Sequence, residues 1–170
     1  TVEYRLDPED GWRIDLEDIR SKMDETVRLL VLINPNNPTG NVATREEIDS
    51  LIEIASDWPR CTIVADEIYD GLDFTGHQCS AASRSSSTPV ITLNGVSKVY
   101  FAPGWRVGYM AWHDPSGALA AVRDGVERLL RSRLCASTPA QHGFLAGLSD
   151  DSGWLEGHRR RIRERMDYCL

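Results

Sequence analysis

Residues 94–109 read Asn-Gly-Val-Ser-Lys-Val-Tyr-Phe-Ala-Pro-Gly-Trp-Arg-Val-Gly-Tyr, and the rest of the chain is organised around this stretch. Lys98 is one of two lysines in a chain that has seventeen arginines. It follows a strand-like run at 89–93 and stands among small and apolar residues. Desolvation in an apolar setting favours the neutral amine, which can attack a carbonyl carbon. The alternative is a lysine at a strand end whose ammonium extends into water.

Arg106 lies eight residues after Lys98, between Gly104 and Gly108. The two glycines let the backbone come close to a ligand, and a guanidinium can bind an oxyanion through two parallel hydrogen bonds. A nucleophilic lysine beside a group that binds phosphate suggests a phosphorylated aldehyde as cofactor.

Strand-like and helix-like segments alternate along the chain, which predicts the α/β class. The apolar runs at 28–33 and 62–65 are typical of parallel strands covered on both faces. Too few residues separate the runs at 90–93 and 107–112 for a helical crossover, so these two strands should be antiparallel. We therefore expect a three-layer α/β/α fold around a mostly parallel sheet with one antiparallel strand.

The remaining segments complete this pattern. We expect a strand at 2–6, helices that begin at Asp15 and after the capping box Thr44–Glu47, a Ser-rich loop at 79–88, and helices at 115–134, from Thr138 and at 153–170.

Composition excludes several classes of partner. The chain has 170 residues, of which 41% are hydrophobic and 26% charged, as in ordinary soluble globular proteins. Its formal net charge of -7 argues against nucleic acid or an anionic membrane as the main partner. The basic cluster Arg159–Arg161 is best explained as a solvated helix face. No apolar run approaches the roughly 20 residues that a membrane span needs.

The four cysteines are widely separated and form no CxxC pair, so we expect neither a zinc site nor a redox motif. The absence of a signal peptide, with Cys61 at the start of an apolar strand, favours reduced thiols in the cytoplasm. The chain opens in a strand without an initiating methionine, so we expect it to be a piece of a longer protein.

Three motifs together resemble one family. They are Asn-Pro-Asn-Asn-Pro-Thr-Gly at 34–40, Asp-Glu-Ile-Tyr at 66–69, and Ser-Lys at 97–98 with Pro-Gly-Trp-Arg-Val-Gly-Tyr at 103–109. In this order and at these intervals they resemble the class I and II aminotransferases, which are pyridoxal-phosphate (PLP) enzymes of fold type I. The resemblance spans about residues 28–112 and is closest to alanine- and aspartate-type members.

The resemblance implies a role for each candidate residue. Lys98 would be the Schiff-base lysine, Asp66 would hold the pyridine nitrogen protonated, and Asn37 and Tyr69 would bind the phenolate oxygen. Arg106 would bind the phosphate. Lys98, Asp66 and Tyr69 would be the catalytic residues. The segments that carry Asn37, Asp66 and Lys98 each follow a strand, and ligands in open α/β sheets bind at the carboxyl ends of parallel strands.

One position departs from the family pattern. Many members have a phosphate-binding serine three residues before the lysine, where this chain has Gly95. Ser97 or a backbone amide would then replace that contact. The resemblance also implies that the Asn37–Pro38 bond is cis.

The order of the motifs implies that residues 1–152 are the central part of a PLP-binding large domain. Residues 153–170 would begin the helix that leads to an absent small domain. The resemblance further implies amino acid and 2-oxo acid substrates, a homodimer, and weak PLP binding by the isolated piece. Amino-group transfer through a Lys98 Schiff base is the expected reaction.

Three alternatives remain open at this point. A PLP-dependent lyase or synthase of the same fold would share every cofactor ligand. An aminotransferase-like effector domain of a transcription regulator would bind PLP without turnover. The third alternative is an inert fragment without cofactor.

Overall fold

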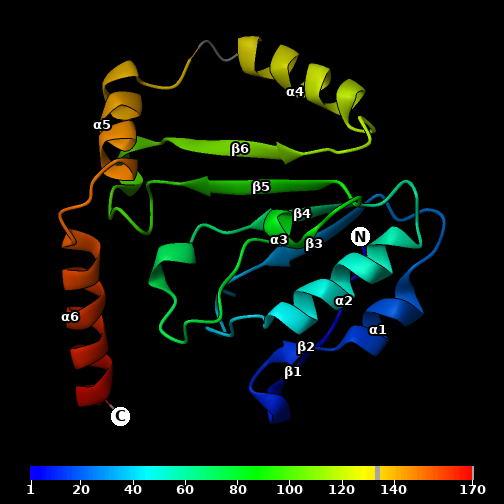
Figure 1. The fold of residues 1–170 in the computed structure, drawn as a ribbon, viewed down its shortest axis with the longest axis horizontal. Helices are drawn as coiled ribbons and strands as arrows, with labels where there is room; N and C mark the ends of the chain where they lie inside the picture. The colour runs from blue at the N-terminus through cyan, green and yellow to red at the C-terminus, as the bar shows by residue number, and fades with distance from the viewer. Residues whose placement is uncertain (133–134, 170) are drawn as a thin grey trace.

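A computed structural model describes residues 1–132 and 135–169 (Figure 1). Its main sheet has four strands in the order β3-β4-β5-β6. These strands are β3 (Leu29–Ile33), β4 (Thr62–Asp66), β5 (Val90–Gly95) and β6 (Gly108–His113). The pairs β3-β4 and β4-β5 are parallel, whereas β6 runs antiparallel to β5. The expected α/β class, with one antiparallel strand in a mostly parallel sheet, is confirmed.

The helices follow the expected order. They are α1 (Leu16–Lys22), α2 (Arg45–Ser56), α3 (Ala81–Arg84), α4 (Ala120–Ser132), α5 (Thr138–Leu148) and α6 (Trp154–Cys169). A small hairpin of β1 (Leu6–Asp7) and β2 (Arg13–Ile14) precedes α1. Short 3-10 turns lie at Pro8–Asp10, Asp70–Leu72 and Pro103–Trp105. Figure 1 shows α5 and α6 at the end of the sheet towards which β5 points.

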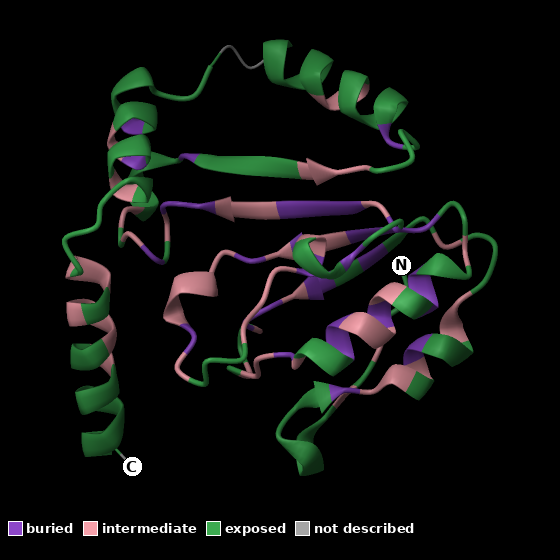
Figure 2. Ribbon diagram, in the orientation of Figure 1, coloured by how far each residue is buried: buried purple, intermediate pink, exposed green. Residues whose placement is uncertain are grey.

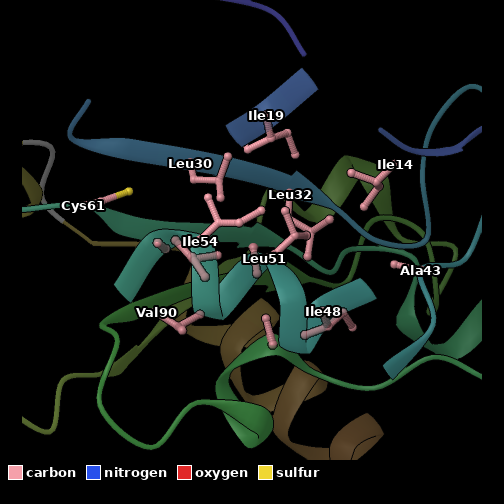
Figure 3. Packing of buried hydrophobic residues seen from close by; sticks show 14 residues of the cluster. Ile14, Ile19, Leu30, Leu32, Ala43, Ile48, Leu51, Ile54, Cys61 and Val90 are labelled. Carbon is pink, nitrogen blue, oxygen red and sulfur yellow. The ribbon is translucent and has the colours of Figure 1, made fainter. Parts of the chain in front are cut away.

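The main core lies between α2 and the sheet (Figure 3). Ile48 and Leu51 of α2 are almost fully buried, as are Leu32 of β3 and Ile63 of β4. Burying one such side chain contributes about 1.5–3 kcal/mol to stability. α2 begins at the expected capping box, in which the Thr44 hydroxyl accepts from the Glu47 amide and the Glu47 carboxylate accepts from the Thr44 amide. This helix and its contacts fix β3 and β4, whose ends carry candidate site residues.

The opposite face of the sheet is only partly covered. Leu29 and Val31 are 57% and 47% exposed, although the apolar run had predicted a strand covered on both faces. Leu29 and Ile91 border a hollow together with Leu119 and Val122, so the segment of α4 approaches this face. Figure 2 shows that α4 and most of β6 are exposed. Among the described residues, the helical layer on the α2 side of the sheet is therefore complete, whereas the layer on the opposite side is only partly built.

Several boundaries differ from the expectation. The first strand is only Leu6–Asp7, and the Ser-rich loop contains the short helix α3. α4 begins at Ala120 rather than at residue 115, because the Asp114 carboxylate accepts from the Leu119 amide and Gly117 has a left-handed backbone, which together hold a loop there. Leu134 and Leu170, the expected last residues of two helices, lie outside the described residues. Within 1–132 and 135–169, no helix has the length and apolar character that crossing a membrane requires.

Candidate active site

The carboxyl ends of the three parallel strands lie side by side. Asp66, the last residue of β4, pairs with Ile33 of β3 on one side and with Leu93 of β5 on the other. The ladder continues one residue further, because the Asn34 amide donates to the Asp66 carbonyl over 3.0 Å and the Glu67 amide donates to the Leu93 carbonyl over 2.9 Å. The segments that carry Asn37, Asp66 and Lys98 therefore leave the same edge of the sheet, as expected.

Lys98 lies beside Tyr69. Its Nζ is 5.6 Å from the centre of the Tyr69 ring, within the range of a cation–π interaction. The side chain is exposed, so the expectation of an apolar, desolvated lysine is wrong for this structure. The apolar neighbours Val96 and Val99 are themselves buried, at 1% and 4% exposure, and Lys98 between them faces outwards.

Asp66 directs the turn that delivers Tyr69. Its Oδ1 accepts a hydrogen bond from the Ile68 amide over 3.2 Å, which bends the chain immediately after β4. Tyr69 and Asn37 then border the same hollow, of about 540 Å³, together with Phe74 and Arg163. The Asn37–Pro38 bond is cis, as the motif implied.

Arg106 and Ser97 border a second hollow, of about 230 Å³, with Gly95 and Gly108. The Arg106 backbone is left-handed, with φ 53°, and its Nη1 donates to the Pro103 carbonyl over 2.7 Å. The six candidate residues thus share one end of the sheet but are divided. Asn37 and Tyr69 border the larger hollow, and Ser97 and Arg106 border the smaller.

The glycine at position 95 has a steric cause. Gly95 of β5 lies opposite Gly108 of β6, and a Cβ atom on Gly95 would stand 2.8 Å from the Val107 carbonyl oxygen. A Cβ atom on Gly108 would stand equally close to the Asn94 carbonyl oxygen. Because both clashes are with backbone, the close approach of the two strands explains why no serine stands there.

The loop that carries Lys98 rests on α5. A Cβ on Gly143 would lie 2.5 Å from the Trp105 ring, and one on Gly147 would lie 2.8 Å from the Tyr100 ring. Phe144, between these glycines, contacts Tyr100 edge-on, with ring centres 5.6 Å apart. The loop between β5 and β6, residues 96–107, is called the lysine loop below. Its aromatic side chains pack against the glycine backbone of α5.

Sequence reasoning missed two polar residues of this region, Asp70 and Asn94. Asn94 Nδ2 donates to Asp70 Oδ2 over 3.0 Å. Burial raises the pKa of the Asp70 carboxyl, and hydrogen bonds from the Gly71 amide and Asn94 act in the opposite direction. The sequence did contain a signal. Asn94 is a polar residue at the end of an apolar strand, and Asp70 is an acid directly after Tyr69, and polar groups in such places need hydrogen-bond partners.

α6 borders the larger hollow through Arg163 and Met166, and two of its arginines bind the loop at 73–74. Arg159 donates to the carbonyl of Asp73, and Arg163 Nη2 donates to the carbonyl of Phe74 over 2.7 Å. Arg160 and Arg161 are exposed, but Arg159 is not, so the expectation of a solvated face for the whole basic cluster is wrong. The reason is that the 73–74 loop presents carbonyl oxygens to one side of this helix.

Comparison with known proteins supports one family. The model of the family "Aminotransferase class I and II" matches residues 1–170. The glutamate-pyruvate aminotransferase AlaA of Escherichia coli is 40% identical over 149 residues, which are 86% of this chain and 36% of that protein.

Two solved structures are similar over almost the whole chain. An alanine aminotransferase from Pyrococcus furiosus is 41% identical with a TM-score of 0.95, over 99% of this chain and 43% of that one. An aspartate aminotransferase double mutant from Thermus thermophilus is 30% identical with a TM-score of 0.85, over 98% of this chain and 42% of that one. The chain therefore spans less than half the length of these relatives. By its motifs, its fold and these similarities, the chain belongs to the class I and II aminotransferase family.

Proposed function

We propose that this chain is the central part of the large domain of a PLP-dependent aminotransferase, which moves an amino group from an L-amino acid to a 2-oxo acid. The observation that carries the proposal is the convergence of Asp66, Tyr69 and Lys98 at one edge of the sheet, with Lys98 Nζ 5.6 Å from the Tyr69 ring. In this proposal residues 1–152 belong to the large domain, and residues 153–170 begin the helix towards a small domain.

The chemistry of the donor set fits PLP. The cofactor presents an aldehyde, a basic ring nitrogen, a phenolate oxygen and a phosphate, and when bound it supplies an electron sink for removal of the substrate α-proton. Lys98 offers the amine, Asp66 a carboxylate, and Arg106 a guanidinium. Ser97 shares the hollow of Arg106, where a hydroxyl adds a second donor for phosphate.

The phenolate oxygen would be held by the remaining pair. Asn37 and Tyr69 border one hollow and both carry hydrogen-bond donors. The Ile68 amide fixes one carboxylate oxygen of Asp66, which would leave the other oxygen for the ring nitrogen. Asn37, Asp66 and Tyr69 would together orient the ring.

Lys98 would have two successive tasks. Its amine would hold the cofactor, and its Nζ, when free, would accept the proton from the substrate Cα as general base. The names of the relatives make glutamate, alanine and pyruvate the first substrates to test.

We also propose that the full-length protein is a cytoplasmic homodimer of amino-acid metabolism. The acidic net charge of -7 and the widely spaced cysteines support an intracellular enzyme with reduced thiols. Light scattering at assay concentration measures the dimer directly. A fully active monomer would contradict this part of the proposal.

The deciding experiment is an amino-transfer assay with the full-length protein. A panel of amino acids is paired with pyruvate or 2-oxoglutarate, and we expect ping-pong kinetics with a new amino acid as product. Lys98→Ala should remove both the transfer and the visible absorbance of bound PLP. Asp66→Ala should retain some PLP but lose most of the rate. Release of ammonia without a new amino acid would instead identify a lyase.

A further inference from the structure

We propose that Asp70 and Asn94 act as a pair of positioning residues, which hold Lys98 in register with Tyr69 for the proton transfer. The family resemblance assigned no role to either residue. The proposal rests on the proposed function, because it concerns the work of Lys98.

The pair is joined by a continuous set of hydrogen bonds. Asp70 Oδ1 accepts from the Gly71 amide over 2.6 Å, and Asp70 Oδ2 accepts from Asn94 Nδ2 over 3.0 Å. Asn94 Oδ1 in turn accepts from the Gly95 amide over 2.7 Å. Both side chains are therefore held in one orientation, with a donor and an acceptor matched at every contact.

The two ends of this set lie next to the proposed catalytic groups. Asp70 directly follows Tyr69, and Asn94 precedes Lys98 by four residues, at the end of β5. The turn after β4 and the end of β5 are already joined by a backbone hydrogen bond from the Glu67 amide to the Leu93 carbonyl, and the Asp70–Asn94 hydrogen bond adds a contact between side chains. The pair is thus a direct side-chain link between the backbone of Tyr69 and the backbone that carries Lys98.

The Asp70 carboxyl is half-buried near other titratable side chains. Tyr100 of the lysine loop and Tyr109 of β6 both have a raised pKa, first because they are partly desolvated and second because the Asp70 charge lies near them. Glu67 is also near, since its pKa is raised by burial and, to a smaller extent, by Asp70. Asp70 and Asn94 are half-buried, and Asn94 borders the smaller hollow together with Ser97 and Arg106, so the link lies beside the proposed phosphate-binding residues.

Loss of the link should affect the reaction more than binding. A displacement of about 1 Å at a reacting group lowers a rate by up to about 100-fold. In the proposed function Lys98 would act in the proton transfer and not in binding the substrate. We therefore expect kcat to fall and KM to change little when the pair is broken.

The test uses an exchange of the two side chains in the full-length protein. The double variant Asp70→Asn/Asn94→Asp keeps all three hydrogen bonds, because the amide at position 70 then donates to the carboxylate at position 94. The single variant Asn94→Asp instead places two carboxylates against each other. We expect kcat to fall about 10-fold to 100-fold in Asn94→Asp and in Asp70→Ala. The double variant should return to within about 3-fold of the wild type.

A second readout is independent of turnover. Backbone hydrogen bonds close the lysine loop, and among their donors are the amides of Val96, Phe101 and Ala102. In the cofactor-free full-length protein, hydrogen exchange at these amides should be faster in Asp70→Ala and Asn94→Asp, and normal in the double variant. Asp73→Ala is the matched control, since its carboxylate accepts from Thr75 and Gln78 within its own loop. That control should leave exchange in the lysine loop unchanged.

The outcomes separate the two proposals. If Lys98→Ala remains active, the proposed function fails. If Lys98→Ala is inactive but the double variant is no more active than Asn94→Asp, the pair does not position Lys98. The inference would also be overturned if Asp70→Ala changed neither kcat nor hydrogen exchange at the amides of the lysine loop. Should Asp70→Ala fail to fold, the comparison of the double variant with Asn94→Asp still decides.

Discussion

At the scale of single residues, Gly95 illustrates how packing can override a family pattern. The family pattern described above would place a serine at this position, but here two strands approach so closely that a Cβ would meet the Val107 carbonyl oxygen at 2.8 Å. Backbone cannot move aside as a flexible side chain can. In the proposed function the phosphate contact would then come from Ser97, Arg106 or a backbone amide.

The corresponding prediction concerns Gly95→Ser. Overpacking against backbone should lower the free energy of unfolding of the full-length protein by about 1–3 kcal/mol, measured by urea unfolding. Gly157→Ala in α6 is the control, because a Cβ there has nothing within 4 Å. Should Gly95→Ser be as stable as the wild type, the strands have room that this structure does not show.

Glu47 is a second residue whose environment gives a measurable prediction. Burial raises the pKa of its carboxyl, but hydrogen bonds from Thr44 and Arg13 outweigh this and lower it. The native state then binds fewer protons than the unfolded state, so Glu47 stabilises the protein above the ordinary carboxyl range. This contribution is lost as pH falls through the lowered native pKa.

We therefore expect Glu47→Gln to be less stable than the wild type at pH 7, by about 1 kcal/mol. The difference should shrink as the solution is made more acidic, and urea unfolding at several pH values measures it. A difference that stays constant with pH would show that the charge of Glu47 is not involved.

At the scale of elements, α5 is more than a surface helix. Trp105 lies over Gly143 and Tyr100 lies over Gly147, so two glycines one turn apart receive the aromatic residues of the lysine loop. Glycine normally weakens a helix interior by roughly 1 kcal/mol relative to alanine. Here that weakness is offset by a close contact which only glycine permits.

Gly143→Ala should therefore destabilise the full-length protein, although alanine is the better helix former. We expect a loss of up to about 2 kcal/mol from the clash with Trp105, together with a change in near-ultraviolet circular dichroism. Gly125→Ala in α4 provides the matched control, as a Cβ there meets nothing within 4 Å. The control should be neutral or more stable by up to about 1 kcal/mol. If Gly143→Ala and Gly125→Ala raised the stability equally, the close packing of Trp105 on Gly143 would be refuted.

The sequence predicted these elements unevenly, for physical reasons. The run at 62–65 and the capping box at Thr44 depend on local pattern and chemistry, and both were placed correctly. Leu29 and Val31 looked equally apolar, but their exposure depends on what packs against β3, which no local pattern contains. Lys98 was misjudged in the same way, since its apolar neighbours turn to the opposite side of the chain.

The candidate site was predictable to a similar extent. Motif order was enough to expect Asn37, Asp66 and Lys98 at one edge, because parallel strands present their ends together. The Asp70–Asn94 hydrogen bond was not predictable, because it joins residues 24 positions apart through side-chain geometry. The Arg159 contact was missed because a helix face alone does not reveal which carbonyls lie opposite it.

At the scale of the whole molecule, exposed apolar surface is the main feature. Leu29 and Val31 are exposed on the sheet, and Leu129 and Leu130 are 69% and 62% exposed on α4. Stable monomers rarely leave such surface and a free strand edge such as β6 uncovered. The chain also covers only 36% of the Escherichia coli relative, so further polypeptide in a full-length protein is available to cover it.

Residues 1–170 expressed alone should therefore self-associate and bind PLP weakly. Light scattering and a fluorescent dye that binds apolar surface would measure the first property, and PLP titration the second. The full-length protein serves as the control. A stable, dye-silent monomer of residues 1–170 with tight PLP binding would contradict this prediction.

The attachment of α6 has a consequence for how the sequence could change over time. Arg159 and Arg163 donate to the backbone carbonyls of Asp73 and Phe74, and a carbonyl is present whatever side chain occupies the position. Substitution of Phe74 would remove the ring over which the Arg163 guanidinium lies at 5.4 Å but would keep the carbonyl that accepts its hydrogen bond, whereas substitution of either arginine removes the hydrogen bond itself. Divergence among descendants of this chain should consequently be freer in the loop at 73–74 than on the face of α6 that meets it.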